Sequence, residues 1–208
     1  MLFEYIKNDL NEEMATKILE ETHYLEEDLF FFLYCIITAL VYYKVFNVSH
    51  GDLQPTNIFI SQSGVYKIVD HTLFNNVSSY MQIQWNPHSS HNNIYLSPDL
   101  MKSLSKDLVQ PLHNENKSDI FTLGMIVLHM ATLDNCDKCY DYSGFKIKQE
   151  EVEMKLASLK KKYTDKLFFF VKGMLIEDEK SRPDYEDLLN MFHGSYEIKT
   201  DYRFKEVY

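Results

Sequence analysis

The loop HGDLQPTN, residues 50–57, contains the residues whose types and spacing are best suited to chemistry. It places Asp52 and Asn57 five residues apart, and Asp70 follows thirteen residues after Asn57. Phosphoryl transfer uses such a set. One carboxylate orients the attacking hydroxyl, while an amide oxygen and a second carboxylate hold the magnesium ions that bridge the phosphates. Asp and Asn are also common in turns, so this spacing alone is a weak indication.

The elements that position this loop are predicted to be a long helix before it and a β hairpin after it. Residues 25–46 are almost continuously apolar and open with an acidic turn, which the helix dipole favours, so they predict a buried helix. Ile58–Ser61 and Val65–Val69 alternate in polarity and are joined by a turn that contains glycine. This pattern indicates a small hairpin.

The rest of the chain is predicted to be mostly helical. Residues 118–133 predict a second buried helix, with Ser118 as its N-cap and Asp119 in its first turn. Further helical patterns lie at 9–22, 149–161, 163–175 and 184–193. The remaining segments are a short strand at 1–6, a long polar loop at 71–93, an acidic loop at 134–147 and a C-terminal tail. The predicted fold class is mainly α with a small β hairpin, within the α+β class.

The composition predicts a packed, acidic protein. Of its 208 residues, 45% are hydrophobic, which is ample for a core and argues against disorder. Its 21 Lys and Arg residues against 31 Asp and Glu give a formal charge of -10, so we expect neither nucleic acid nor an anionic membrane surface as a partner. The apolar run Leu29 to Tyr43 is shorter than the roughly 20 residues that cross a bilayer.

The cysteines predict a reducing, cytoplasmic or otherwise intracellular compartment. Cys35, Cys136 and Cys139 are too few, and odd in number, for a disulfide framework. Cys136 and Cys139 form a CxxC without a second pair, so we expect no structural metal. The charged N-terminus shows no signal-peptide pattern.

These motifs together resemble the eukaryotic protein kinase superfamily. HGDLQPTN resembles the catalytic loop H-R-D-L-K-P-x-N, and Asp70 stands where the family has D-F-G. Further segments match in the same order: Phe3 to Ile6 the hinge, Tyr95 to Asp99 the A-P-E region, Ser118 to Gly124 the central helix, and Ser181 to Pro183 the late Arg-Pro motif. The resemblance implies a kinase-like C-terminal lobe with its hinge at 1–193 and a tail at 194–208.

The resemblance also implies roles for the residues around the reaction. Asp52 would be the catalytic base, and Asn57 and Asp70 would bind magnesium. Glu4 and Ile6 would offer hinge backbone groups to the adenine of ATP. Gln54 stands in the cofactor-binding position where the family has a lysine facing the transferred phosphate.

A second set of matching residues would hold the fold. Asp119 would accept backbone N–H groups of the catalytic loop, in which His50 stands, and Asp99 would pair with Arg182. The structural residues implied are His50, Asp99, Asp119 and Arg182. Breaking a partly buried ion pair of this kind should cost several kcal/mol, of order 3–5.

Several departures from the family weaken the expected activity. Gly51 replaces an arginine that receives an activation phosphate, and Gln54 supplies no positive charge to the phosphoryl group. Asp70-His71-Thr72 replaces D-F-G, and the stretch from Lys102 to Asn116 is longer than the family spacing. The chain starts at the hinge, without a glycine-rich loop or a strand lysine. We therefore expect weak or absent ATP binding and no measurable transfer as the chain stands.

Three functions remain open at this point. One is a protein kinase domain of the Ser/Thr type with weak or no activity, acting on a protein substrate. Another is a pseudokinase that binds or scaffolds a partner protein, and the apolar residues Leu2, Phe3 and Ile6 would favour association. The last is a small-molecule phosphotransferase of the aminoglycoside or choline type. A Gly at position 51 is normal in those enzymes, but the segments after residue 94 do not match them.

Overall fold

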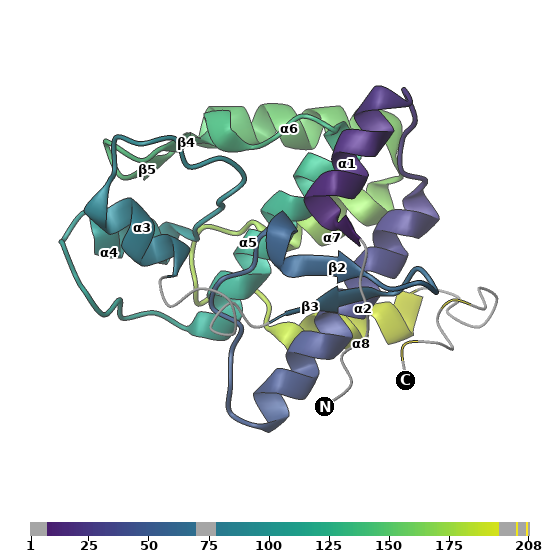
Figure 1. The fold of residues 1–208 in the computed structure, drawn as a ribbon. Helices are drawn as coiled ribbons and strands as arrows, with labels where there is room; N and C mark the ends of the chain where they lie inside the picture. The colour runs from purple at the N-terminus through teal and green to yellow at the C-terminus, as the bar shows by residue number, and fades with distance from the viewer. Residues whose placement is uncertain (1–7, 70–77, 196–202, 204–206, 208) are drawn as a thin grey trace.

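The computed structural model describes residues 8–69, 78–195, 203 and 207, with the backbone alone at 193–195. Helices surround two central ones, α2 (Glu26–Val45) and α5 (Glu115–Thr132), and two small antiparallel sheets accompany them (Figure 1). The predicted class, mainly α with little β structure, is therefore confirmed. The strand predicted at 1–6 lies outside the described residues.

Helix α2 is the buried helix predicted at 25–46. Its first turn carries Glu26, Glu27 and Asp28, and the Asp28 carboxylate accepts the N–H of Leu25 at 3.0 Å. By length and composition it is the one helix among the described residues that could span a membrane, and 56% of its most apolar window is buried in the protein. It packs against α8 (Tyr185–Ser195), α5 and strand β3, which is the environment of a core helix.

Helix α5 begins earlier than the sequence predicted. Its N-cap is Asn114, whose side chain accepts the N–H of Lys117 at 3.1 Å, and not Ser118. Ser118 is buried one turn inside the helix, where its hydroxyl lies 2.9 Å from that of Ser97. The apolar pattern starts only at Ile120. The first turn of the helix is polar, so the pattern did not indicate it.

The predicted hairpin is the centre of a three-stranded sheet. Strands β2 (Ile58–Ile60) and β3 (Tyr66–Ile68) pair antiparallel, and β1 (Asn8–Asp9) adds on the other edge of β2. The turn between β2 and β3 contains Gly64 at φ +82°, a left-handed conformation that glycine adopts without strain. Strand β3 packs against α2, and β2 begins directly after the loop at 50–57.

Two predicted loops contain regular structure. Residues 71–93 include α3 (Ser79–Trp85), and residues 134–147 include a 3-10 turn at Asp137–Cys139 and the paired strands β4 (Tyr140–Asp141) and β5 (Lys146–Ile147). The loop predictions are wrong there. Elements this short give too few residues for a periodic pattern, and Ser78 caps α3 through a local hydrogen bond to the N–H of Met81.

The other helices complete the lobe. Helix α4 (Pro98–Leu104) packs beside α3 and β5, at the left of Figure 1. The remaining helices are α1 (Leu10–Leu19), α6 (Gln149–Lys162) and α7 (Asp165–Met174). In the segment predicted as a tail, Arg203 pairs with Asp28 at 2.9 Å and lies over the ring of Phe31. This part of the tail therefore contacts the start of α2.

Candidate active site

The loop at 50–57 is held from below by a carboxylate of α5. Asp119 accepts the backbone N–H of His50 at 3.0 Å and the N–H of Gly51 at 3.0 and 3.2 Å. Gly51 has φ +74°, a conformation that costs other residues about 1–2 kcal/mol. The loop is thus fixed by two adjacent N–H groups that bind the same side chain.

Asp119 is itself locked in place by a group that the sequence did not reveal. The hydroxyl of Tyr185, in α8, donates to Asp119 Oδ2 at 2.6 Å, and both residues are buried. Burial raises the pKa of Asp119, while the charge of His50 and the donated hydrogen bonds oppose that shift. Three elements, α5, α8 and the loop, therefore meet at one carboxylate.

Asp52 and Asn57 lie in contact within the loop that Asp119 holds. Asn57 Nδ2 donates to the backbone oxygen of Asp52 at 2.9 Å, which leaves Asn57 Oδ1 free to ligate a divalent cation. Oxygen donors of this kind suit magnesium, so Asn57 fits the metal site that the resemblance implies. His50 Nε2 lies 2.9 Å from the oxygen of Val69, which ties the loop to the residue before Asp70.

Not all of the predicted site is described. Glu4, Ile6 and Asp70 lie outside the described residues. Gln54 is partly exposed just before the 3-10 turn Pro55–Asn57. Within 8–69, 78–195, 203 and 207, no group of three or more His, Cys, Asp or Glu side chains could hold a metal ion.

The carboxylate of Asp52 is engaged by α3. The backbone N–H of Ser79 donates to Asp52 Oδ1 at 3.2 Å, and Asp52 is only 7% exposed. Sequence analysis missed this contact because α3 gives no periodic signal. The position of Tyr185, two residues after Pro183, could have indicated the Asp119 contact only if the course of α8 had been known.

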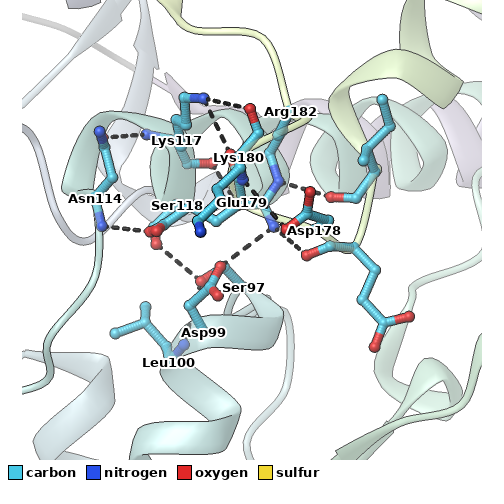
Figure 2. A network of polar contacts seen from close by, with 12 residues as sticks. Ser97, Asp99, Leu100, Asn114, Lys117, Ser118, Asp178, Glu179, Lys180 and Arg182 are labelled. Atoms are coloured by element: carbon cyan, nitrogen blue, oxygen red, sulfur yellow. Dashed lines mark hydrogen bonds and ion pairs between the residues drawn. The ribbon is translucent and has the colours of Figure 1, made fainter.

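The pair Asp99 and Arg182 lies in a separate network (Figure 2). Arg182 is fully buried, and Nη2 lies 3.3 Å from Asp99 Oδ2. Its guanidinium also donates to the backbone oxygens of Lys117, Ile176 and Glu177 at 2.8–3.0 Å. Burial lowers the pKa of Arg182 and Asp99 opposes the shift. Four hydrogen bonds to oxygen atoms stabilise the buried guanidinium.

A groove of about 610 Å³ runs beside Asp99, between α4, β5 and residues 177–180. None of the residues of the 50–57 loop lines it. The space near Asp52 is far smaller, about 20 Å³. The large groove is therefore not part of the site around Asp52.

Comparisons with known proteins agree with this arrangement. The family model for the protein kinase domain matches residues 1–193. The probable serine/threonine-protein kinase nek3 of Dictyostelium discoideum is 25% identical over 199 residues, which is 92% of this chain and 16% of the relative. Serine/threonine-protein kinase Nek4 of Mus musculus is 25% identical over 78% of this chain and 19% of its own length. Mitogen-activated protein kinase 4 of Homo sapiens is 32% identical over 62% of this chain and 20% of its own length. The chain thus spans a fifth or less of the length of these relatives.

Proposed function

Because the chain belongs to the protein kinase family, we propose that it is a kinase-like domain for phosphoryl transfer from ATP to a Ser or Thr hydroxyl of a protein. We propose that this transfer is weak or absent in the chain as it stands. The observation that carries the proposal is the loop geometry, in which Asp119 holds His50 and Gly51 while Asn57 holds Asp52. The names of two relatives, the serine/threonine-protein kinases nek3 and Nek4, support the Ser/Thr type.

In this mechanism the chain mainly positions groups. Asp52 would orient the acceptor hydroxyl and take its proton, and Asn57 Oδ1 with Asp70 would hold magnesium. Magnesium, when bound, would neutralise charge on the phosphates. Tyr185 and Asp119 would act only through the loop, by fixing the backbone that carries Asp52.

The weakness follows from missing positive charge. Gln54 is neutral where the resemblance implies a lysine, and Gly51 offers no side chain where it implies an arginine. Electrostatic stabilisation is usually the largest catalytic contribution in such sites. A loop with this geometry but without these charges should bind and orient the reactants better than it accelerates phosphoryl transfer.

The test is a transfer assay on the 208-residue chain with radiolabelled ATP, magnesium and generic protein substrates. We expect little or no incorporation by the wild type and an increase in Gln54→Lys, which restores one charge. Asp52→Ala in the Gln54→Lys background should abolish that increase. Incorporation that survives Asp52→Ala would show that this loop does not carry the reaction.

A second candidate is a pseudokinase that binds a partner protein. It is favoured by the hydrogen bond from Ser79 to Asp52, which occupies the carboxylate. The two candidates differ in nucleotide binding. A rise in melting temperature with magnesium and ATP that Asn57→Ala removes would support the kinase. No rise, together with no transfer in Gln54→Lys, would favour the binding module. For both candidates we propose an intracellular location, which suits three buried free cysteines.

A further inference from the structure

We propose that Cys136 and Cys139 are a modification site, at which a peroxide oxidises the two thiols to an intramolecular disulfide and thereby loosens the hold on residues 93–96. The pair lies between α5 and β4, outside the loop at 50–57. The inference goes beyond the proposed function, and it stands or falls separately from phosphoryl transfer.

The backbone brings the two thiols to the separation that a disulfide requires. Cys136 precedes the 3-10 helix Asp137–Cys139, and the N–H of Cys139 donates to the oxygen of Cys136 at 2.9 Å. A turn closed in this way keeps its first and fourth Cα atoms within about 7 Å, and side chains three residues apart eclipse in a 3-10 helix. Disulfides join Cα atoms that are roughly 4.4–6.8 Å apart. The two thiols are already hydrogen-bonded to each other, so a small movement suffices to form the bond.

The two sulfurs differ chemically, and this assigns a role to each. The hydrogen bond with Cys136 lowers the pKa of Cys139, and the positive charge of Lys155 adds to that shift while burial opposes it. The same hydrogen bond, together with burial, raises the pKa of Cys136. Lys155 is buried and held in place by Asp134, whose Oδ2 lies 2.6 Å from Lys155 Nζ. Because the thiolate is the reactive form, Cys139 is the attacking group and Cys136 the resolving one.

With hydrogen peroxide as the oxidant, the reaction balances in two steps. The Cys139 thiolate attacks a peroxide oxygen and the O–O bond breaks. The leaving hydroxide takes up the thiol proton as water, and Cys139 becomes a sulfenic acid. The sulfur of Cys136 then attacks Cys139 Sγ, so that the S–O bond breaks, the S–S bond forms, and the Cys136 proton leaves with the oxygen as water. The two thiols lose two electrons to the peroxide, and a thiol reductant reverses the change by exchange.

The oxidant must be small, because both sulfurs are covered in the reduced protein. Cys136 and Cys139 are 0% exposed. The segment that contains them, residues 134–147, has one short 3-10 helix and two strands of two residues each. Segments with so little regular structure open at a lower cost in free energy than core helices do. Hydrogen peroxide, which is little larger than water, needs a smaller opening than a bulky thiol reagent.

The segment that carries the pair also holds residues 93–96. Three hydrogen bonds of 2.9–3.1 Å connect the two segments: Cys136 N to the Tyr95 hydroxyl, Asn93 N to Asp137 Oδ1, and the Tyr140 hydroxyl to the oxygen of Leu96. Cys136 Sγ also donates to the oxygen of Met125 in α5 at 3.5 Å. A disulfide removes this S–H and draws Cys136 toward Cys139, so the N–H that contacts Tyr95 has to shift. Oxidation should therefore loosen residues 93–96.

The formation of the disulfide can be tested on the reduced 208-residue chain. Hydrogen peroxide is added, the remaining thiols are blocked with N-ethylmaleimide in urea, and tryptic peptides are identified by mass spectrometry. Trypsin cleaves after Lys138, between the two cysteines, so a disulfide leaves two peptides joined. Cys35 is the matched internal control, because it is buried in α2 and burial raises its pKa to about 12.

We expect joined peptides at peroxide doses that leave Cys35 unmodified. Oxidation of Cys35 while Cys136 and Cys139 stay reduced would overturn the site, as would joining that occurs only after the chain is unfolded. The roles of the two sulfurs are tested with dimedone, which traps sulfenic acids. It should label Cys139 in Cys136→Ser but leave Cys136 unlabelled in Cys139→Ser. The reverse pattern would overturn the assigned roles.

Hydrogen exchange tests the effect on residues 93–96. The amide of Asn93 should exchange faster in the oxidised chain than in the reduced chain, and dithiothreitol should restore the slow rate. Amides of α8, which packs on α2 and α5, are the control and should not change. Joined peptides with unchanged exchange at 93–96 would overturn the proposed loosening. Neither measurement involves phosphoryl transfer, so an inactive Gln54→Lys variant would count against the proposed function alone.

Discussion

Arg182 and Asp52 are both buried charged residues, but their side chains differ in how many hydrogen bonds they make. The Arg182 side chain is 0% exposed, and all three of its nitrogens donate hydrogen bonds. Asp52 is nearly as buried, yet the described contact of its carboxylate is one N–H at 3.2 Å, beside an unpartnered hydroxyl of Ser79. The guanidinium of Arg182 therefore donates four hydrogen bonds, whereas the buried carboxylate of Asp52 accepts one from the described residues.

Helix α5 connects the two regions, and this explains why they can differ. In its first turns, the backbone oxygen of Lys117 accepts from Arg182, and the carboxylate of Asp119 accepts from the loop at 50–57. Gly51 and Gln54, which are uncharged where the resemblance implies an arginine and a lysine, both lie on the loop side. A fold held by Arg182 does not need positive charge at these positions, so the lobe can be stable whether or not it transfers phosphate.

The largest expected effect is the loss of Arg182. Arg182→Met should destabilise the chain by about 3–5 kcal/mol, because three backbone oxygens and Asp99 lose a buried partner. Urea unfolding followed by circular dichroism measures the change. Arg203→Met is the matched control, since Arg203 and Asp28 are both 28% exposed and the pair is therefore more solvated, so we expect a smaller loss. Similar losses in the two variants would remove the basis of the comparison.

A pH effect should arise on the scaffold side, away from Asp52. Burial lowers the pKa of His129 to about 4, the positive charge of Lys155 adds to the shift, and Asp134 opposes it. The folded state therefore disfavours the protonated ring. The stability is fully present above the unfolded pKa of 6.5 and is lost as the pH falls from 6.5 toward 4, by about 3 kcal/mol in all.

The variant His129→Gln separates this effect from other titrations. Glutamine can still hydrogen-bond the Tyr95 hydroxyl, which lies 3.1 Å from His129 Nδ1, but it does not titrate. The difference between the unfolding free energies of the two proteins should change between pH 7.5, 5.5 and 4.5, because only the wild type loses the His129 contribution as the pH falls. Parallel pH profiles would show that His129 is not the group responsible.

The sequence predicted the scaffold better than the site. Helix α2 was found within one residue because twenty residues of apolar sequence outweigh local detail. The start of α5 was wrong because Asn114, a polar cap, stands outside the apolar pattern. Elements as short as α3 depend on tertiary contacts such as Tyr80 to Leu108, and no single-sequence pattern encodes those.

In the candidate site, too, local patterns could be predicted from the sequence and distant contacts could not. The motif predicted that Asp52 and Asn57 lie together, because their spacing is local, and Asn57 does donate to the backbone oxygen of Asp52. The groups that brace or cover them, Tyr185 and Ser79, are 66 and 27 residues away from their partners in the chain. Such distant contacts decide whether the carboxylates are fixed or accessible, and only the folded arrangement reveals them.

Tyr185→Phe tests the link between the two regions. It removes the hydroxyl that donates to Asp119 Oδ2 at 2.6 Å and leaves the ring packed. We expect a loss of about 1–3 kcal/mol in unfolding free energy, because a buried carboxylate loses a donor. Tyr42→Phe, at a residue that is 62% exposed, should be close to neutral. If Tyr185→Phe is equally neutral, α8 does not brace the loop.

The smallest effect concerns Gly51, where the family resemblance suggested only a lost charge. Its φ of +74° lies in the left-handed region, while an added Cβ would meet no atom within 4 Å. Gly51→Ala should therefore cost about 1 kcal/mol through the backbone alone. Gly173→Ala is the matched control: that site is equally open but helical, so alanine should stabilise by up to about 1 kcal/mol. Opposite signs in urea unfolding would show that Gly51 sets the turn that points two N–H groups at Asp119. A neutral Gly51→Ala would leave the missing arginine as the sole consequence of glycine at this position.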